Sequence, residues 1–583
     1  MKASKFIAKY LEKRGVNHVF EMSGGMITHL LDSIYLEDKI KIISTHHEQA
    51  AAFAAEGLAR MNGIPGIAFA TSGPGATNLI TGIGSCYFDS TPVVFITGQV
   101  NTNEQKGKLP IRQLGFQETD IVKIAAPITK AVFKINKPDE IPKFFESAFK
   151  IALSGRPGPV LIDIPMDLQR AELKEDLIKR FLQKSNLPNL KKRDNSKVDI
   201  FYKSLIEVIK VSKRPLLLVG GGIRSGRAHD VCVKFIDKLG IPVINSLMGV
   251  DILPHNHPLR VGMIGSYGNR FANTTLAESD FVLVLGSRLD IRQTGGDVNS
   301  FKEGRKIFHV DIDESELNFR VKGCTTLKLN LYDFFEYGNG DRKKIIKNKN
   351  FSFWITHIMQ LRKRLLDVDE LKDCLGINPN IFMHKLSYYS KKITAYVVDV
   401  GQHQMWAAQS LDLESHQRFL TSGGMGSMGF SLPAAVGASL ASLKNKPVMV
   451  IAGDGGAQLN IQELETIKHN KIPIKIVIIN NQSYGMVRQF QESYFNSRFQ
   501  STVWGYSAPS FEKLAKAYGI EGRRINKPEE IEKALVWLNE DLTKPSLLEV
   551  MIDSSINVYP KLAFGKKFGE MEPQVKPTEM EGI

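Results

Sequence analysis

The chain has 583 residues, more than one hydrophobic core supports, and this length predicts three or four domains. Its net charge of +15 could indicate a nucleic-acid partner, but much of the excess lies in two connector-like segments, 191–197 and 341–350, and we expect no nucleic acid to bind. No apolar run reaches the length of a membrane span and the first residues lack a signal-like apolar segment, so we expect a cytoplasmic protein without a membrane partner.

Residues 1–170 alternate apolar strand-like segments with amphipathic helical segments. The strand-like segments are VNHVF, KIIST, GIAFATSG, TPVVFITG and GPVLIDIP. This alternation predicts an α/β domain with a mostly parallel sheet flanked by helices. An Ala-rich run then predicts a helix with Glu48 in its first turn, where a carboxylate complements the helix dipole.

A second α/β unit is predicted at 198–340, after a connector at about 170–200. In this unit RPLLLVGGG reads as a strand followed by three glycines. Alone, that pattern is weak evidence for a dinucleotide site, because packing explains it equally well. A Lys-rich connector with one helix, 341–375, leads to a third α/β domain at 375–560, whose layout resembles that of the first.

The third domain contains the strongest chemical signal. Residues 448–452 read as a buried strand, followed by a Gly-rich turn with Asp454 and a helix with an apolar face of Leu459, Leu464 and Ile467. A second buried strand, 474–479, ends at Asn480 and Asn481. Such a crossover makes the two strands parallel, so Asp454 and Asn481 are expected at the same sheet edge.

The residue types at this edge suit a metal and a diphosphate. Gly453, Gly455 and Gly456 allow the backbone to approach a ligand, and the following helix presents its N-terminus to an anion. A carboxylate with an amide oxygen suits Mg²⁺. Gly-Asp-Gly also describes an ordinary turn, but the Asn-Asn pair that ends the next strand favours the metal-diphosphate interpretation.

Gly-Asp-Gly followed at this distance by Asn-Asn resembles the cofactor motif of thiamine diphosphate enzymes. TSGPGATN at 71–78, FQE at 116–118, GQHQMWAAQ at 401–409 and GSMGFSLPAAVGA at 426–438 are similar to the acetohydroxyacid synthase (acetolactate synthase) branch. The resemblance covers nearly the whole chain. It implies three domains that bind, in order, the pyrimidine of the cofactor, a flavin, and the diphosphate with its magnesium.

The resemblance also implies the cofactors thiamine diphosphate, Mg and FAD, the last with a largely structural role, and it assigns residues to each. The implied metal ligands are Asp454, Asn481 and the carbonyl of Ser483. Glu48 is expected on the aminopyrimidine, Gln117 near the cofactor, Lys130 near the substrate entry, and Gly25 in the catalytic group. The implied thiamine diphosphate contacts are Gln402, His403, Gly426, Met428, Gly453, Gly455 and Gly456. The implied FAD contacts are Arg156, Gly220, Gly221, Gly222, Leu247, Met248, Gly265, Gly286, Arg288, Asp290, Arg292 and Asp311.

The implied reaction decarboxylates pyruvate and transfers the two-carbon hydroxyethyl unit to an acceptor carbonyl. The acceptor is left open, because the chain departs from the family around the acceptor channel, at Met26, Asn101, Ser266–Tyr267 and Phe490. With pyruvate as acceptor the product is 2-acetolactate. The alternative is a larger ketone, such as a nucleotide-linked keto sugar in branched-sugar biosynthesis.

A simple 2-oxo acid decarboxylase or pyruvate oxidase fits less well, since the match is to the synthase branch. A catalytically dead homologue would have lost Glu48, Asp454 or Asn481, and all three are present. The resemblance further implies a homodimer or homotetramer with active sites between subunits.

Overall fold

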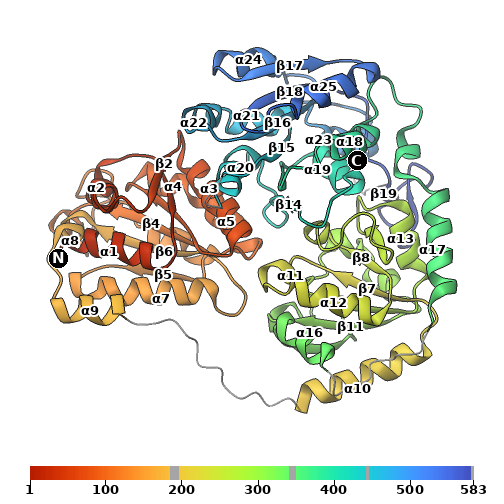
Figure 1. Cartoon of the computed structure of the whole chain (residues 1–583), viewed down its shortest axis with the longest axis horizontal. Coiled ribbons are helices and arrows are strands. Elements are labelled where there is room, and N and C mark those ends of the chain that lie inside the picture. The colour runs from red at the N-terminus through yellow and green to blue at the C-terminus, as the bar shows by residue number, and fades with distance from the viewer. Residues whose placement is uncertain (184–195, 341–349, 442–444, 580–583) are drawn as a thin grey trace.

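The computed structural model describes residues 1–183, 196–340, 350–441 and 445–579. They form three α/β domains, each built on a six-stranded parallel sheet flanked by helices, which confirms the expected fold class. The first domain stands to one side of the other two, which lie one above the other (Figure 1). Most of both basic connectors, 191–195 and 341–349, lies outside the described residues. The predicted domain boundaries stay a prediction.

The first domain has the strand order β2-β1-β3-β4-β6-β5. Its strands are β1 (His18–Glu21), β2 (Lys41–Ser44), β3 (Gly66–Ala70), β4 (Val93–Gln99), β5 (Ala131–Lys134) and β6 (Val160–Pro165). Its helices are α1 (Ala3–Lys13), α2 (Thr28–Glu37), α3 (Glu48–Asn62), α4 (Pro74–Asn78), α5 (Ile80–Phe88), α6 (Ile121–Ala125), α7 (Ile141–Leu153) and α8 (Met166–Arg170). Each of the five expected strands forms. Sequence reasoning missed β5, an edge strand whose side chains are only partly buried.

The middle domain has the strand order β12-β11-β10-β7-β8-β9. Its strands are β7 (Pro215–Val219), β8 (Val243–Asn245), β9 (Arg260–Met263), β10 (Phe281–Leu285), β11 (Lys306–Asp311) and β12 (Thr325–Lys328). Its helices are α11 (Gly222–Ser225), α12 (His229–Leu239), α13 (Arg270–Glu278), α14 (Ile291–Thr294), α15 (Val298–Lys302) and α16 (Leu331–Asn339). This is the order of dinucleotide-binding folds, with the switch point between β7 and β10. Gly220–Gly222 and Gly286 follow these two strands, so the three glycines lie where such folds bind ligands.

The third domain repeats the order of the first, as β14-β13-β15-β16-β18-β17. Its strands are β13 (Ala395–Val398), β14 (Arg418–Leu420), β15 (Val448–Gly453), β16 (Ile474–Asn480), β17 (Glu521–Ile525) and β18 (Ser546–Met551). Its helices are α18 (Pro379–Tyr389), α19 (Gln402–Ser410), α20 (Ser431–Leu440), α21 (Asp454–Leu459), α22 (Glu463–His469), α23 (Gly485–Tyr494), α24 (Phe511–Ala517) and α25 (Ile531–Leu538), and a hairpin of β19 (Lys561–Leu562) and β20 (Met571–Glu572) follows.

The expected strand-helix-strand unit is present, with β15 and β16 paired in parallel from Val448–Ile474 to Gly453–Ile479. The prediction of a single helix between these two strands was wrong. The structure has two short helices, α21 and α22, and Leu459 at the end of α21 is 52% exposed rather than part of an apolar face. The break lies at Asn460, whose amide donates to Gln49 Oε1 at 3.1 Å and to the Gly429 carbonyl at 2.8 Å.

The first and third domains share one apolar core. Helix α3 follows the second strand of the first domain and α20 follows the second strand of the third, and the two helices pack against each other. Their contact is reciprocal. A Cβ on Gly57 would lie 2.0 Å from the Ala434 oxygen, and a Cβ on Gly437 would lie 1.8 Å from the Ala54 oxygen. Only glycine permits this approach of two backbones.

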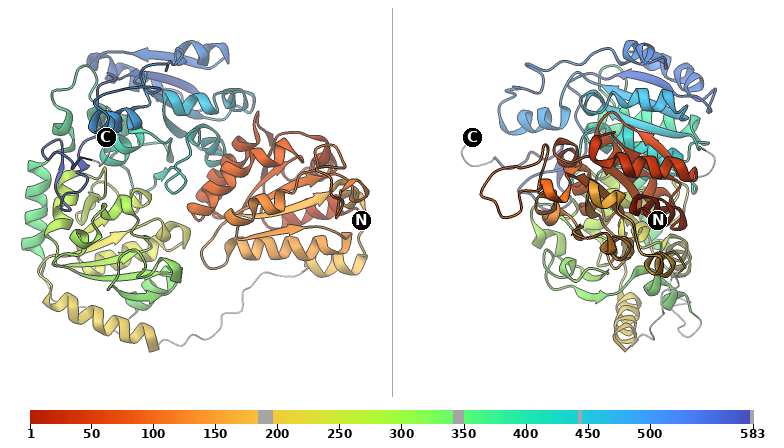
Figure 2. Two further views of the ribbon diagram at one scale, coloured as in Figure 1. Left: turned by 180° about the vertical axis from the view of Figure 1, so that it is seen from behind. Right: turned by 90° about the vertical axis from the view of Figure 1, so that its left-hand side faces the viewer.

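The connectors contain more helix than expected. Helix α9 (Glu175–Gln183) lies in the connector predicted at 170–200, and α10 (Ser196–Val211) follows the undescribed part. Helix α17 (Ser352–Arg364) is the helix expected in the second connector, and it runs along the outer side of the middle domain toward the third (Figures 1 and 2). No helix among the described residues is long and apolar enough to cross a membrane.

Candidate active site

Asp454 lies at the carboxyl edge of the third sheet, where β15 ends and α21 begins. Its side chain is buried, and the Tyr506 hydroxyl donates to Oδ2 at 3.0 Å. Burial raises the pKa of Asp454 to about 6, although hydrogen bonds from Tyr506 and from the Gly455 and Ser483 amides act the other way. A carboxylate in such surroundings gains from a cation, which binds its ionised form.

His403 lies in the first turn of α19, next to Gly453, the residue before Asp454. Its ring packs against two glycines: a Cβ on Gly401 would lie 2.6 Å from Cε1, and a Cβ on Gly453 would lie 2.8 Å from Nδ1. Burial lowers the pKa of His403 to about 3, so the ring is neutral. Among the described residues its buried Nε2 has no hydrogen-bond partner. A buried nitrogen without a hydrogen-bond partner is consistent with a site that binds a ligand.

Asn481 and Ser483 complete the group. The Asn481 amide donates to Gln402 Oε1 at 3.0 Å, and the Ser483 amide donates to Asn481 Oδ1 at 3.2 Å. Ser483 Oγ is buried and has no partner among the described residues. The structure therefore brings Asp454, Gln402, Asn481 and Ser483 together. In the described part of the chain no cluster of three or more His, Cys, Asp or Glu offers a competing metal centre.

Gly426 and Met428 lie in the loop between β14 and α20, which faces this group. Met428 Cε is 3.3 Å from the position that a Cβ on Gly455 would take. Gly426 has a left-handed φ of 69° and borders open space. A hydrogen bond at the end of β13 holds the loop in place, because the Gly429 amide donates to Asp399 Oδ1 at 2.9 Å. Exposed Gly426 and half-buried Met428 thus form one wall of the candidate site.

A second group forms around the loop Thr71–Gly75, which follows β3 in the first domain. Glu48 is 6% exposed and accepts a hydrogen bond from the Asn78 amide at 2.9 Å. Glu48 Oε1 lies 3.0 Å from the Cβ position of Gly75, and Gln117 Cβ lies 2.9 Å from that of Gly73. The loop's first residue, Thr71, accepts from the Met26 amide at 3.2 Å, beside Gly25. Of the four expected catalytic residues, Gly25, Glu48 and Gln117 therefore gather here.

Lys130 is placed elsewhere. Its ammonium group donates to the carbonyls of Ile151 and Ser154, at the C-terminal end of α7, and burial lowers its pKa. These contacts hold the turn that carries Arg156. The expected role of Lys130 near the substrate entry stays a prediction.

A cleft with about 1250 Å³ of empty space, open solvent included, lies between the three domains. The first domain contributes Phe88–Ser90 and Gly155–Pro157, and the third contributes Met405, Gly423 and Gly424. Ten of the twelve expected FAD residues line it: Arg156, Gly221, Gly222, Leu247, Met248, Gly286, Arg288, Asp290, Arg292 and Asp311. Gly220 and Gly265 lie behind the wall, against the carbonyls of Gly286 and Arg292. Ser266 and Tyr267, which depart from the family pattern, also line the cleft.

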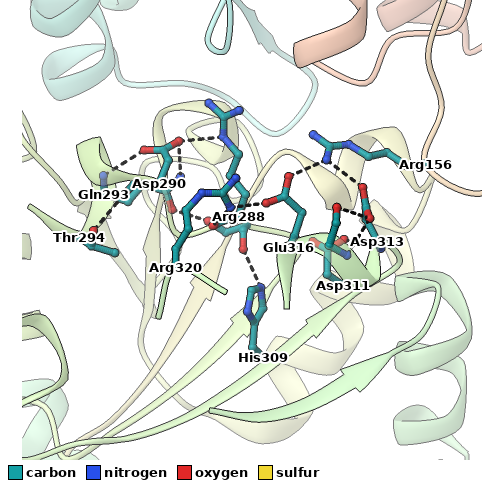
Figure 3. Close-up of polar contacts among 12 residues, drawn as sticks. Arg156, Arg288, Asp290, Gln293, Thr294, His309, Asp311, Asp313, Glu316 and Arg320 are labelled. Carbon is teal, nitrogen blue, oxygen red and sulfur yellow. Dashed lines mark hydrogen bonds and ion pairs between the residues drawn. The ribbon is translucent and has the colours of Figure 1, made fainter. Parts of the chain in front are cut away.

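Arg156 joins the first domain to the middle domain across this cleft (Figure 3). Its guanidinium donates to Glu316 Oε1 at 2.7 Å and to Asp313 Oδ2 at 3.2 Å. On the opposite side Arg288 Nε pairs with Asp290 Oδ2 at 2.9 Å. Burial raises the pKa of nearby Asp311 to about 6. The cleft thus presents both guanidinium groups and buried or half-buried carboxyl groups to a bound molecule.

Comparison with known proteins places the chain in a family. The family model of the thiamine pyrophosphate enzyme N-terminal TPP binding domain matches residues 1–124, that of the central domain matches 202–330, and that of the C-terminal TPP binding domain matches 399–550. The chain is 37% identical to a probable acetolactate synthase large subunit of Methanocaldococcus jannaschii, over 100% of this chain and 98% of that protein. It is a thiamine pyrophosphate enzyme of the acetolactate synthase large-subunit family.

Two further members support this placement. The acetolactate synthase large subunit of Lactococcus lactis is 37% identical over 97% of this chain and 95% of its own length. The acetolactate synthase isozyme 2 large subunit of Escherichia coli is 36% identical over 98% of this chain and 99% of its own. The family expected from the sequence motifs is therefore confirmed.

Sequence reasoning missed two carboxylates that shape the site of this thiamine pyrophosphate enzyme. Asp399 directly follows β13 and accepts hydrogen bonds from the amides of Gly429 and Ser431 at 2.9 and 2.8 Å. Asp89 lines the cleft and accepts from the amides of Gly423 and Gly424 at 2.9 and 2.7 Å. The sequence could have indicated Asp399, since it follows a buried strand just as Asp454 does. Asp89 carries no such signal, because its partners are 334 and 335 residues away.

Proposed function

We propose that this enzyme is an acetolactate synthase: it decarboxylates pyruvate and transfers the two-carbon hydroxyethyl unit to the carbonyl of a second pyruvate. The observation that carries the proposal is the group at the carboxyl edge of the third sheet, where Asp454, Asn481 and Ser483 meet Gln402 and His403. The names of the relatives favour pyruvate as acceptor. They do not favour the larger-ketone alternative.

The residues present fit thiamine diphosphate and magnesium. Asp454, the Asn481 amide and the Ser483 carbonyl would hold the metal, since Mg²⁺ prefers oxygen ligands. His403 Nε2 and Ser483 Oγ, which have no partner among the described residues, are suited to diphosphate oxygens. Gly426, Met428 and the glycines at 453, 455 and 456 would flank the cofactor. When bound, thiamine diphosphate supplies the electron sink that decarboxylation of a 2-oxo acid requires.

The chain's own residues supply position and proton transfer. Glu48 would hold a proton at the aminopyrimidine, and Asn78 fixes the orientation of its carboxyl group through a 2.9 Å hydrogen bond. Met428 would set the shape of the cofactor by its bulk. Gln117, held against Gly73, and Gly25 would border the substrate, because both lie at the loop that contacts Glu48.

FAD fits the interdomain cleft. The middle sheet has the dinucleotide-binding order, and Gly221, Gly222 and Gly286 line the cleft at its switch point. Arg156, Arg288 and Arg292 suit the pyrophosphate. Since the cleft is lined by all three domains, the flavin would have a largely structural role.

The proposal includes a homodimer or a homotetramer. Among the described residues Glu48 accepts a hydrogen bond from Asn78 of its own domain, and no hydrogen bond joins Glu48 to the Asp454 group. A second subunit that set its Glu48 against this Asp454 would complete the site. A cytoplasmic location stays a prediction.

The test is an incubation of purified protein with thiamine diphosphate, magnesium, FAD and pyruvate, in which acetolactate (as acetoin after acid treatment) and carbon dioxide are measured. Rapid acetolactate formation is expected. Release of carbon dioxide with free acetaldehyde, or of acetate with peroxide, would contradict the proposal and indicate a decarboxylase or an oxidase.

A further inference from the structure

A second cavity, with about 910 Å³ of empty space, lies between helix α17 and the edge strand β9 of the middle sheet. It is separate from the flavin cleft and from the Asp454 group. Among the described residues its lining contains five basic side chains, His255, His257, Arg260, Arg362 and Lys363, and no carboxylate. The remaining walls are largely apolar and include aliphatic side chains of α17.

Arg260 and Arg362 are the two arginines of this lining. Among the described residues neither guanidinium forms an ion pair or a hydrogen bond. Arg362 lies over the Phe271 ring, with its Cζ 5.9 Å from the ring centroid. Burial and the charge of Arg362 lower the pKa of Arg260 to about 10. Two unpartnered cations in one partly enclosed cavity repel each other, and a bound anion would offset that cost.

The carboxylates around the cavity already have hydrogen-bond partners, and one of these partners, His257, belongs to the lining. Asp237 accepts from His257 Nε2 at 3.0 Å. Asp367 and Asp412 hold the two nitrogens of His384 at 2.9 and 2.8 Å. Asp367 and Asp412 act on Arg260 only through space. The positive charge of the cavity is therefore only partly compensated.

We propose that this cavity binds a small organic anion, a carboxylate or phosphate group attached to an apolar body. The planar guanidinium of Arg260 and that of Arg362 suit the oxygens of such a group, and the aliphatic walls suit the body. The cavity also touches the third domain, since the amide of His255 donates to the Leu413 carbonyl at 2.9 Å. A bound anion would therefore hold α17, the middle domain and the loop after α19 together.

The test is titration calorimetry of the cofactor-loaded protein at constant ionic strength, with hexyl phosphate, hexanoate and inorganic phosphate as probes. Saturable binding of hexyl phosphate or hexanoate is expected, and the tighter of the two identifies the head group. Inorganic phosphate, which lacks the apolar body, is expected to bind more weakly.

Arg362→Met is expected to weaken binding about tenfold or more, as for loss of a charge-assisted hydrogen bond. Arg364→Met, an exposed arginine of the same helix outside the cavity, serves as the matched control and should leave binding unchanged. Arg260→Met should act like Arg362→Met. If it does not fold, the variant of half-buried Arg362 still decides. No saturable binding of any probe, or equal weakening by Arg364→Met, would overturn the proposal.

Discussion

The first and third domains have the same strand order, but their sheet edges carry different chemistry. After the third strand of the first domain comes a loop of small residues, Thr71–Gly75, that lies against Glu48 at Gly75. After the third strand of the third domain comes Asp454, and the His403 ring, whose Nε2 has no partner in the described part of the chain, packs against the preceding Gly453. Topology decides where along an open α/β sheet a ligand can bind, and the few residues that follow each strand decide which part of the ligand is held.

Asp454→Asn tests the third-domain half of this comparison. Loss of the charged metal ligand is expected to lower acetolactate formation about a thousandfold. An amide binds Mg²⁺ more weakly than a carboxylate does, and the metal in turn would hold the diphosphate. The measurement is turnover against magnesium concentration, with flavin absorbance as the control, since the flavin cleft lies elsewhere. Activity close to wild type at ordinary magnesium would contradict the assignment of Asp454.

Glu48→Gln tests the first-domain half. Turnover is expected to fall about a hundredfold to a thousandfold, while magnesium and thiamine diphosphate still bind, because Glu48 moves a proton and does not hold the metal. Equilibrium binding of the cofactor, followed by protein fluorescence, separates the two effects. If the variant lost cofactor binding together with turnover, the separation of proton transfer at the first sheet from cofactor binding at the third would be contradicted.

The sequence predicted the local features of both halves. Buried strands, Gly-Asp-Gly and the Asn-Asn pair are short-range patterns, and the structure places Asp454 and Asn481 at one edge as parallel pairing requires. Features that depend on distant residues could not be predicted. The break between α21 and α22 is one, because Asn460 ends α21 by bonding to Gln49 of another domain. The contact of Asn78 with Glu48 is another, since nothing in either segment indicates the other.

The reciprocal contact of α3 and α20 allows a symmetric test. Gly57→Val and Gly437→Val should each lower the free energy of unfolding by about 3 kcal/mol, because each new side chain would meet a carbonyl of the other helix. Chemical denaturation measures both. Gly296→Val, at an exposed glycine whose Cβ position is open, is the control and should change little. Unequal losses would show that the two helices are equivalent in topology but not in packing.

Two histidines should give the two domains opposite responses to pH. In the first domain, burial and Lys41 lower the pKa of His18 to about 4. In the third, burial opposes protonation of His384, but Asp367 and Asp412 outweigh it and raise the pKa to about 10. Unfolded histidine titrates near 6.5. His18 therefore contributes stability that is present above about pH 6.5 and is lost as pH falls through 4. His384 contributes stability that is complete below about pH 6.5 and is lost as pH rises through 10.

The smallest expected effect follows from these signs. His384→Asn should cost about 2 kcal/mol at pH 7 and much less near pH 10.5, where the wild-type ring has lost its proton as well. His18→Asn should flatten the loss of stability between about pH 6.5 and 4, because the unfolded chain no longer gains a proton there. Thermal unfolding across this range measures both. If the curves of the variants run parallel to that of the wild type, the two domains do not differ in this way.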